Sequence, residues 1–226
     1  MNWQDEGFLL SKIKFRENAN IINVFTNTRG KVSGIIYGGT SRKIRNFLQI
    51  SNKIFIIHNS KLENRLGYFK TELIEAISPK YFNNKQKTSA LLSIASILNV
   101  LLPESQPYKN LYVSLDNLLK NLDKEKWIID YIYWELTLLK ELGFDPFLEQ
   151  FVVEANQMLK YKFIEIDNVK YQVPIFLLTN DKKYNLESKD ASMALNFTRS
   201  ILTNKFFFPN NLTFPKSRII LENYFN

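Results

Sequence analysis

Residues 21–37 have the sequence IINVFTNTRGKVSGIIY, in which two β-rich runs flank a polar turn. Ile21–Thr26 and Lys31–Tyr37 are rich in β-branched and aromatic residues, and Thr28-Arg29-Gly30 between them is typical of a turn. The pattern predicts two short strands that follow each other closely along the chain.

The same β-rich pattern extends over the first 80 residues. Further runs of this kind occupy Phe8–Phe15, Ile54–Ile57 and Tyr68–Ile77. Five short strands in about 80 residues fit a small closed barrel, and the OB-fold, which commonly binds oligonucleotides, is a five-stranded barrel of this kind. We therefore expect residues 1–80 to form an OB-fold barrel.

After Ser78-Pro79 the hydrophobic pattern changes from the period of a strand to that of a helix. Apolar residues at helical spacing predict helices at Leu91–Leu102, ended by Pro103, at Tyr108–Leu122 and at Lys124–Leu142. The third helix is apolar over much of its circumference and is followed by Gly143, a residue typical of helix ends. It is expected at the centre of a bundle.

The remaining third of the chain is less regular. Short β-like runs at Tyr161–Ile166 and Val169–Val173 flank Asp167-Asn168 and predict a hairpin. Helical patterns return at Lys189–Thr203, with Ser188 as the expected N-cap, and at Lys216–Phe225. The expected fold class is α+β, with a five-stranded OB-fold barrel in residues 1–80 and an α-helical bundle in residues 81–226 that carries a small hairpin-like insertion at 144–174.

Positive charge is concentrated in the amino-terminal part of the chain. The formal net charge is +8; residues 1–80 hold 13 Lys and Arg against 6 Asp and Glu, a net +7, and residues 81–226 hold 17 against 16. Localised positive charge on a small domain suits a polyanion, because phosphate neutralisation releases counterions. The candidate phosphate contacts are Arg29, Lys31, Arg42, Lys43 and Arg45 in or beside turns, and Lys12, Lys14 and Arg16 in the first strand.

Each group of cations also has a simpler explanation. The glycines of residues 38–45, GGTSRKIR, lack the spacing of a Walker loop, so a tight turn followed by an exposed basic segment is expected, with charges that either solvate the turn or contact DNA. Lys12, Lys14 and Arg16 recur with a period of two and should share one face of a strand, which a solvated outer face explains equally well. The aromatic residues interleaved with these cations are Phe15, Phe25, Tyr37 and Phe47, and none is assigned a base-stacking role.

The sequence offers no visible machinery for catalysis. The chain contains no cysteine, which rules out disulfides, thiol catalysis and cysteine-ligated metals. Its single histidine, His58, is expected to mark a strand end after Ile54–Ile57. No acidic cluster has metal-ligand spacing and no nucleotide fingerprint occurs. We therefore expect a protein that is not an enzyme and needs no cofactor or metal. The absence of a long apolar run or a signal segment predicts a cytoplasmic protein without a membrane partner.

Several motifs occur in the same order as in a known family. They are residues 3–7 (WQDEG), 25–31 (FTNTRGK), 38–43 (GGTSRK), Tyr68-Phe69, 134–144 (WELTLLKELGF) and 194–199 (ALNFTR). In these motifs the chain resembles the bacterial RecO family of DNA repair proteins, and the similarity runs nearly from end to end.

The resemblance implies functions that the residue patterns do not show. It implies a nucleoid-associated mediator of recombinational repair that binds single- and double-stranded DNA and anneals complementary strands. It also implies docking of RecR and of the C-terminal tail of single-stranded DNA-binding protein, which together assist the loading of RecA. For that acidic, apolar-ended tail, the candidate residues are Arg199 as a cationic rim and Phe197 and Ile201 near it, although an arginine on a late helix is more often a solvated or ion-paired surface group. The rival hypothesis is an interaction adaptor whose barrel binds protein and not DNA.

One departure from the family concerns zinc. Many members of the family carry a cysteine zinc module between the central and late helices, whereas residues 144–174 of this chain contain no cysteine. We expect the zinc module to be lost, with Phe151, Val152 and Val153 supplying apolar packing in its place.

Overall fold

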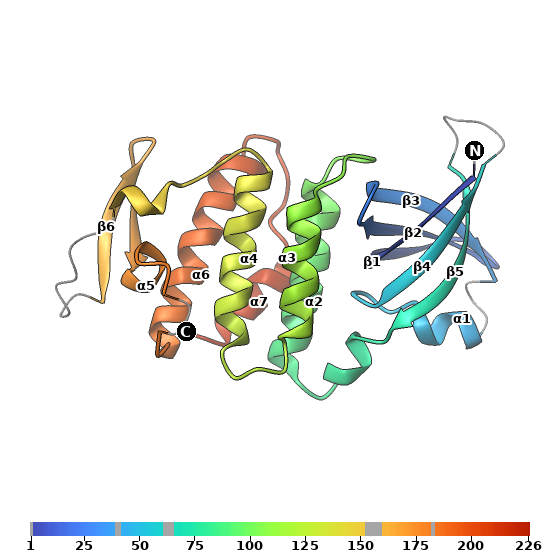
Figure 1. Ribbon diagram of the computed structural model, residues 1–226, viewed down its shortest axis with the longest axis horizontal. Coiled ribbons are helices and arrows are strands. Elements are labelled where there is room, and N and C mark those ends of the chain that lie inside the picture. Colours follow the sequence, from blue (N-terminus) through green and yellow to red (C-terminus); the bar gives the residue numbers. More distant parts are fainter. Residues whose placement is uncertain (1, 39–41, 61–65, 152–159, 182–183) are drawn as a thin grey trace. The chain divides into compact units, whose positions relative to one another are not determined.

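The computed structural model describes residues 2–38, 42–60, 66–151, 160–181 and 184–226, without the side chains of Arg42, Lys43 and Arg45 (Figure 1). The chain divides into two compact units, Met1–Tyr112 with Pro215–Arg218, and Val113–Phe214 with Ile219–Asn226. The fold class is α+β, as predicted, with an amino-terminal five-stranded sheet, a helical region and a small two-stranded sheet. The predicted domain boundary at residue 80 stays a prediction.

Five strands form a closed barrel in the first unit. They are β1 (Asn2–Arg16), β2 (Ala19–Thr26), β3 (Gly30–Tyr37), β4 (Lys53–Asn59) and β5 (Tyr68–Glu75), in the order β1-β2-β3-β5-β4 (Figure 1). The amino-terminal half of β1 pairs with β4, and a parallel pairing of Ile35 with Tyr68 joins β3 to β5. The strand number and the OB-like arrangement confirm the prediction from the β-rich runs.

The barrel core follows from the alternation of each strand. Leu9 of β1 pairs with Val24 of β2, which pairs with Val32 of β3, and all three side chains are buried. Residues that pair across neighbouring strands point to the same face of the sheet, so this row of buried side chains fills the interior of the barrel. The predicted first strand, Phe8–Phe15, was too short. Asp5 and Glu6 are poor strand formers, but pairing with β4 makes them part of β1.

A short helix, α1 (Arg42–Phe47), lies where an exposed basic segment was predicted. Ile44 and Phe47 are partly buried against the barrel core, and Leu48, just after the helix, belongs to that core. Residues three and four positions apart share a helix face, so these apolar side chains together give the helix a buried side. The prediction missed the helix because its apolar face is only three residues long.

The helices that follow agree with the predicted periodicity. After the 3₁₀ turn η1 (Ser78–Tyr81) come α2 (Lys85–Leu101) and α3 (Lys109–Lys120). The Asn84 side chain accepts a hydrogen bond from the backbone N–H of Lys87 at 3.0 Å and so caps α2. The helix ends as predicted, because Leu102 takes the extended conformation that a following Pro103 favours.

The second unit contains α4, the hairpin and α6. The α4 helix (Trp127–Glu141) has nine buried residues and is followed by Gly143 with φ 93°, which confirms the predicted buried helix and its glycine stop. The strands β6 (Tyr161–Ile166) and β7 (Val169–Pro174) form the predicted hairpin, with Asp167 and Asn168 both at positive φ in the turn.

Several shorter elements were not foreseen. The η2 turn (Leu148–Phe151), α5 (Ile175–Leu178) and the π-helical turn η3 (Thr203–Phe207) accompany the predicted α6 (Ser188–Leu202) and α7 (Lys216–Asn223). The N-cap of α6 is Glu187 and not Ser188, because Glu187 and Asp190 form a reciprocal capping box. Among the helices of the described residues, none is both long and apolar enough to cross a membrane.

Candidate nucleic-acid interface

The turn between β2 and β3 holds Arg29 in a defined position. Asp5 of β1 accepts hydrogen bonds from the backbone N–H of Thr28 at 3.0 Å and from its hydroxyl at 2.6 Å, which fixes the turn. The Arg29 guanidinium carbon lies 4.7 Å from the centre of the Trp3 ring, and Trp3 stacks on His58 with ring centres 4.7 Å apart. Arg29 is exposed, so this stack presents a cation to solvent.

Lys31, two residues further along, has a different environment. Its side chain is held inside the first unit, where Nζ donates a hydrogen bond to the carbonyl oxygen of Asn99 at 2.9 Å and lies 3.6 Å from Oε1 of Glu104. The residue is only 9% exposed. Protein groups thus engage its charge, which argues against the predicted DNA contact by Lys31.

The period of two had suggested that the three cations of β1 share one face of the strand. In the structure they do not. Lys14 pairs with Asn20, but a register shift follows and Arg16 pairs with Ala19. Paired residues of neighbouring strands point to the same face of the sheet, whereas the successive residues Ala19 and Asn20 of β2 point to opposite faces. Arg16 therefore faces away from the side that Lys12 and Lys14 share. The prediction is therefore wrong for Arg16, because one extra residue in β1 turns the Arg16 side chain to the opposite face of the strand.

These three cations also differ in exposure. The Lys12 ammonium group donates a hydrogen bond to the carbonyl oxygen of Leu48 at 2.9 Å, which ties it to the end of α1. Lys14 and Arg16 are exposed. Two of the three are thus open to solvent on opposite faces of β1.

The basic segment of residues 42–45 is placed only by its backbone. Arg42, Lys43 and Arg45 all belong to α1, and their side chains lie outside the described part of the structure. The turn residues 39–41 that precede them also lie outside it. A DNA contact by these three cations stays a prediction.

An exposed pair of tyrosines was not singled out from the sequence. Tyr37 at the end of β3 and Tyr68 at the start of β5 stack with ring centres 5.2 Å apart and an interplanar angle of 29°. They are 53% and 47% exposed. Most aromatic residues of a small barrel belong to its core, so nothing in the sequence distinguished Tyr37, and the pair becomes visible only once β3 and β5 are neighbours.

The residues predicted to bind a peptide tail do not form one surface. Phe197 is buried and lines a pocket of about 400 Å³ in the second unit. Arg199 instead forms an ion pair with Glu222, with Nε 3.0 Å from Oε2, and Ile201 is completely buried. The ion-paired alternative for Arg199 therefore describes its environment.

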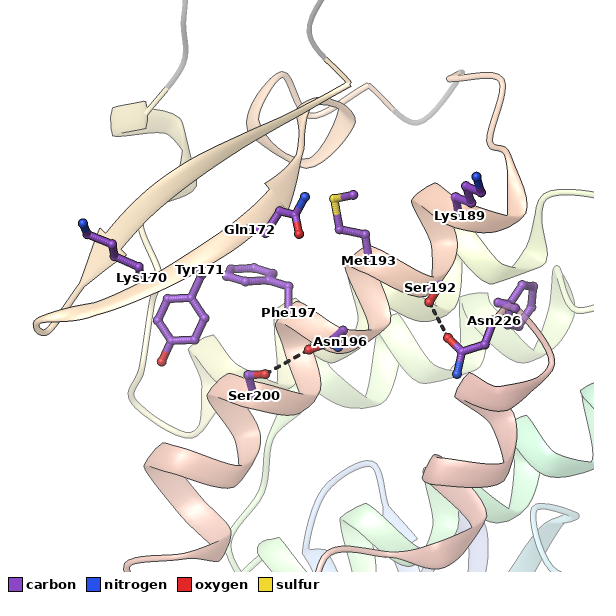
Figure 2. Close-up of a pocket in the computed structure, with 11 residues that line it drawn as sticks. Lys170, Tyr171, Gln172, Lys189, Ser192, Met193, Asn196, Phe197, Ser200 and Asn226 are labelled. Carbon is purple, nitrogen blue, oxygen red and sulfur yellow. Dashed lines mark hydrogen bonds between the residues drawn. The ribbon is translucent and has the colours of Figure 1, made fainter.

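The pocket lies between α6 and the β6–β7 hairpin (Figure 2). Tyr171 of β7 and Phe197 of α6 meet edge to face, with ring centres 5.7 Å apart, and Met193 adds a flexible apolar side chain. Lys170 and Lys189 also line the pocket, one on the hairpin and one on the helix (Figure 2). An apolar floor with two cations suits a ligand that is both apolar and acidic.

The part of the chain that the structure describes holds no donor set for a metal. Across residues 2–38, 42–60, 66–151, 160–181 and 184–226, no three His, Cys, Asp or Glu residues come together in a group that could hold an ion. Phe151 ends η2 and its carbonyl oxygen accepts a hydrogen bond from Lys162 at 3.2 Å. Val152 and Val153 lie outside the described residues, so the packing expected in place of a zinc module stays a prediction.

Two protein-family models together match most of the chain. Residues 1–77 match the family described as Recombination protein O N terminal, and residues 84–170 match Recombination protein O C terminal. The chain belongs to the RecO family. The predicted resemblance is confirmed, and the barrel with Arg16, Arg29 and the tyrosine pair falls within the amino-terminal match.

Individual relatives agree with the RecO family assignment. A protein of Roseobacter denitrificans named DNA repair protein RecO is 34% identical over 158 residues, which are 70% of this chain and 66% of that protein. A protein of Rickettsia canadensis with the same name is 31% identical over 224 residues, 93% of this chain and 91% of that one. Among solved structures, Entamoeba histolytica asparaginyl-tRNA synthetase aligns with a TM-score of 0.28 at 11% identity over 75% of this chain and 39% of its own, which is too low to indicate a shared fold.

Proposed function

We propose that this RecO-family chain binds DNA through its barrel and acts, without catalysis of its own, as a mediator of recombinational repair. Membership in the family supports a role in DNA repair and recombination. The observation that supports direct DNA binding is the set of exposed cations on the barrel unit, Lys14, Arg16 and Arg29, in the part of the chain that carries a net +7 from 13 Lys and Arg against 6 Asp and Glu.

The proposed mechanism is electrostatic. Lys14, Arg16, Arg29 and the cations of α1 neutralise phosphates on single- or double-stranded DNA, and the released counterions supply the affinity. Two complementary strands bound in this way repel each other less, so base pairing between them proceeds and the strands anneal. Contacts of this kind go to the backbone and do not depend on sequence.

The helical region has the proposed role of holding partner proteins. These are RecR and the C-terminal tail of single-stranded DNA-binding protein, and with them the chain assists RecA loading. The pocket between α6 and the β6–β7 hairpin supports binding of the single-stranded DNA-binding protein tail. Lys170 and Lys189 suit the acidic residues and the carboxylate of this tail. Phe197 and Met193 suit its apolar end.

The salt dependence of DNA binding tests the electrostatic mechanism. Fluorescence anisotropy with labelled oligonucleotides gives the slope of log affinity against log salt, and removal of one phosphate-binding cation flattens that slope by about 0.7 to 0.9. We expect Arg42→Ala, Lys43→Ala and Arg45→Ala together to weaken binding and flatten the slope. A matched control removes three exposed lysines of the second unit, with Lys120→Ala, Lys124→Ala and Lys140→Ala, and leaves the slope unchanged.

Two other results would change the proposal. An unaltered slope in the α1 variant would remove those three residues from the interface. If the unmodified chain bound oligonucleotides neither tightly nor with salt sensitivity, the adaptor hypothesis, in which the barrel binds protein, would replace direct DNA binding.

Peptide binding separates the two candidate tail sites. We expect an acidic peptide with an apolar carboxyl-terminal residue to bind the chain, and Lys189→Glu to weaken that binding because the charge beside the pocket is reversed. Arg199→Ala should leave the affinity unchanged, because Arg199 faces Glu222. Lys124→Glu is the control for an equal change of net charge. The opposite pattern, with loss in the Arg199 variant alone, would return the site to the residues predicted from the sequence.

A further inference from the structure

The tyrosine pair, Tyr37 with Tyr68, lies on the outer face of the barrel. Ile36, the neighbour of Tyr37 in β3, and Phe69, the neighbour of Tyr68 in β5, both belong to the buried core of the barrel. Because neighbouring residues of a strand point to opposite faces, both tyrosine rings point outward. The side chain of Tyr68 beside it, by hydrogen bonding, raises the pKa of Tyr37.

A cation lies on the same face as this pair. Arg16 pairs with Ala19, and Ala19 pairs with Tyr37, so the three residues form one row across β1, β2 and β3. Arg16 is the charged group whose field acts on the Tyr37 hydroxyl, where it opposes part of the rise in pKa. Its guanidinium also lies 5.2 Å from the centre of the exposed Phe15 ring. The outer face thus joins aromatic surface to positive charge.

This combination favours a nucleic acid over an apolar protein surface as the occupant. Stacked, half-exposed rings offer a flat π-face to a base, and an arginine at their edge offers two or more N–H donors to a phosphate. The site is also at the ends of β3 and β5 and beside the β1–β2 turn, and OB-folds use their strand 2–3 face and the loops at these positions to bind oligonucleotides. Bases inside a duplex are stacked on each other and cannot reach such a platform.

Resting on the proposed DNA binding, we propose that Tyr37, Tyr68 and Arg16 form a subsite for an unpaired base of single-stranded DNA. The base stacks on the tyrosine pair, and Arg16 contacts the adjoining phosphate. The subsite gives the barrel a preference for unpaired over paired DNA that phosphate contacts alone do not supply.

Oligonucleotides that lack bases test this subsite directly. A thymidine strand and an abasic strand of equal length carry the same phosphates, so the ratio of their affinities measures the contribution of the bases. We expect the unmodified chain to bind the thymidine strand more tightly, and Tyr37→Ala with Tyr68→Ala to reduce this ratio by about fivefold or more, the factor that corresponds to loss of one stacked base. The salt slope should not change, since no charge is removed.

Two matched variants separate stacking from other effects. Tyr37→Phe with Tyr68→Phe keeps the rings and should keep the ratio, whereas Tyr161→Ala with Phe163→Ala removes an exposed aromatic pair of the hairpin and should leave the ratio unaltered. As a readout that does not depend on the alanine variant folding, Tyr68→Trp places an indole in the pair. Its fluorescence, taken as the difference from the unmodified chain with its three tryptophans, should be quenched by the thymidine strand and not by the abasic strand.

The outcomes for the subsite and for general DNA binding are distinguishable. Equal affinity of the unmodified chain for thymidine and abasic strands, with a steep salt slope, overturns the subsite and leaves electrostatic binding standing. Loss of binding to a partner protein in the alanine variant, with the ratio intact, assigns the tyrosine pair to a protein contact and also overturns it. Absence of any DNA binding would instead refute the proposed function.

Discussion

The Lys31 ammonium group in β3 donates a hydrogen bond to the main-chain carbonyl oxygen of Asn99 in α2 at 2.9 Å. Asn99 lies in the last turn of this helix, which ends at Leu101. The last carbonyl groups of a helix lack partners within it and carry the negative end of its dipole, so a cation there is favourable. Glu104 adds a carboxylate 3.6 Å from the same ammonium group. The barrel thus supplies a cation that stabilises the end of a helix.

Replacement of this lysine should therefore affect stability and not DNA affinity. Lys31→Met keeps most of the aliphatic side chain and removes the charge and the hydrogen bond. We expect the free energy of unfolding, measured by urea denaturation, to fall by about 1.5 to 3 kcal/mol, the usual range for a hydrogen bond to a charged group. The affinity of the folded variant for DNA should stay the same.

Lys14→Met is the control for the Lys31 variant, because Lys14 is exposed on β1. It should weaken DNA binding with little change in the free energy of unfolding. If the two variants exchanged these effects, Lys31 would belong to the DNA contacts after all.

A buried carboxylate joins α4 to α6 in the second unit. Glu135 is fully buried and accepts hydrogen bonds from the hydroxyl groups of Tyr131 and Thr198. Thr198→Val has nearly the same shape but removes one donor, so we expect a loss of about 1 to 3 kcal/mol in the free energy of unfolding. Thr198→Ser keeps the hydroxyl group and should lose clearly less. No loss in the Thr198→Val variant, with a clear loss in Thr198→Ser, would attribute the stability at this position to packing of the methyl group and not to the hydrogen bond.

The fold was predictable where local chemistry decides the backbone. Asp167 and Asn168 tolerate positive φ, so a turn between two β-rich runs could be recognised from the sequence, and Gly143 marked the end of α4 in the same way. The α1 helix was not predictable, because its few apolar residues become a helix face only against a barrel core assembled from distant strands.

The candidate site was less predictable than the fold, for the same reason. Arg29 and Lys31 are equivalent as cations in the sequence, but one lies over Trp3 at the surface and the other reaches Asn99, which is 68 positions further along the chain. Arg16 changed faces because of a register shift that no periodicity reveals. The sequence locates an excess of positive charge, and only the three-dimensional fold distributes it between structural and exposed roles.

The stability of the second unit should decline at high pH through Tyr133. Burial raises the pKa of Tyr133 to about 12 from its ordinary value of 10.0, and its hydroxyl group donates a hydrogen bond to the carbonyl oxygen of Phe176 at 3.2 Å. Because the folded pKa is the higher one, this contribution is complete below the unfolded pKa of 10.0 and is lost as pH rises toward about 12.

Comparison with Tyr133→Phe isolates that contribution. At about pH 9 the variant should be less stable than the unmodified chain, because it lacks the hydrogen bond, and at about pH 11 the difference in the free energy of unfolding should shrink. Denaturant unfolding at both pH values measures it. A difference that stays constant or grows would contradict the raised pKa.

Gly67 should tolerate no side chain while His58 stacks on Trp3. A Cβ atom added at Gly67 would lie 2.0 Å from Nε2 of His58, and the imidazole is confined by Trp3 on one side and by the edge of Phe69 on another. We expect Gly67→Ala to lower the melting temperature, because His58 must leave this stack. In the background of His58→Ala the space is free, so the same substitution should cost much less, and the double-mutant cycle should show strong coupling. Additive effects of the two substitutions would mean that the glycine is required for its backbone conformation and not for the close approach of the histidine.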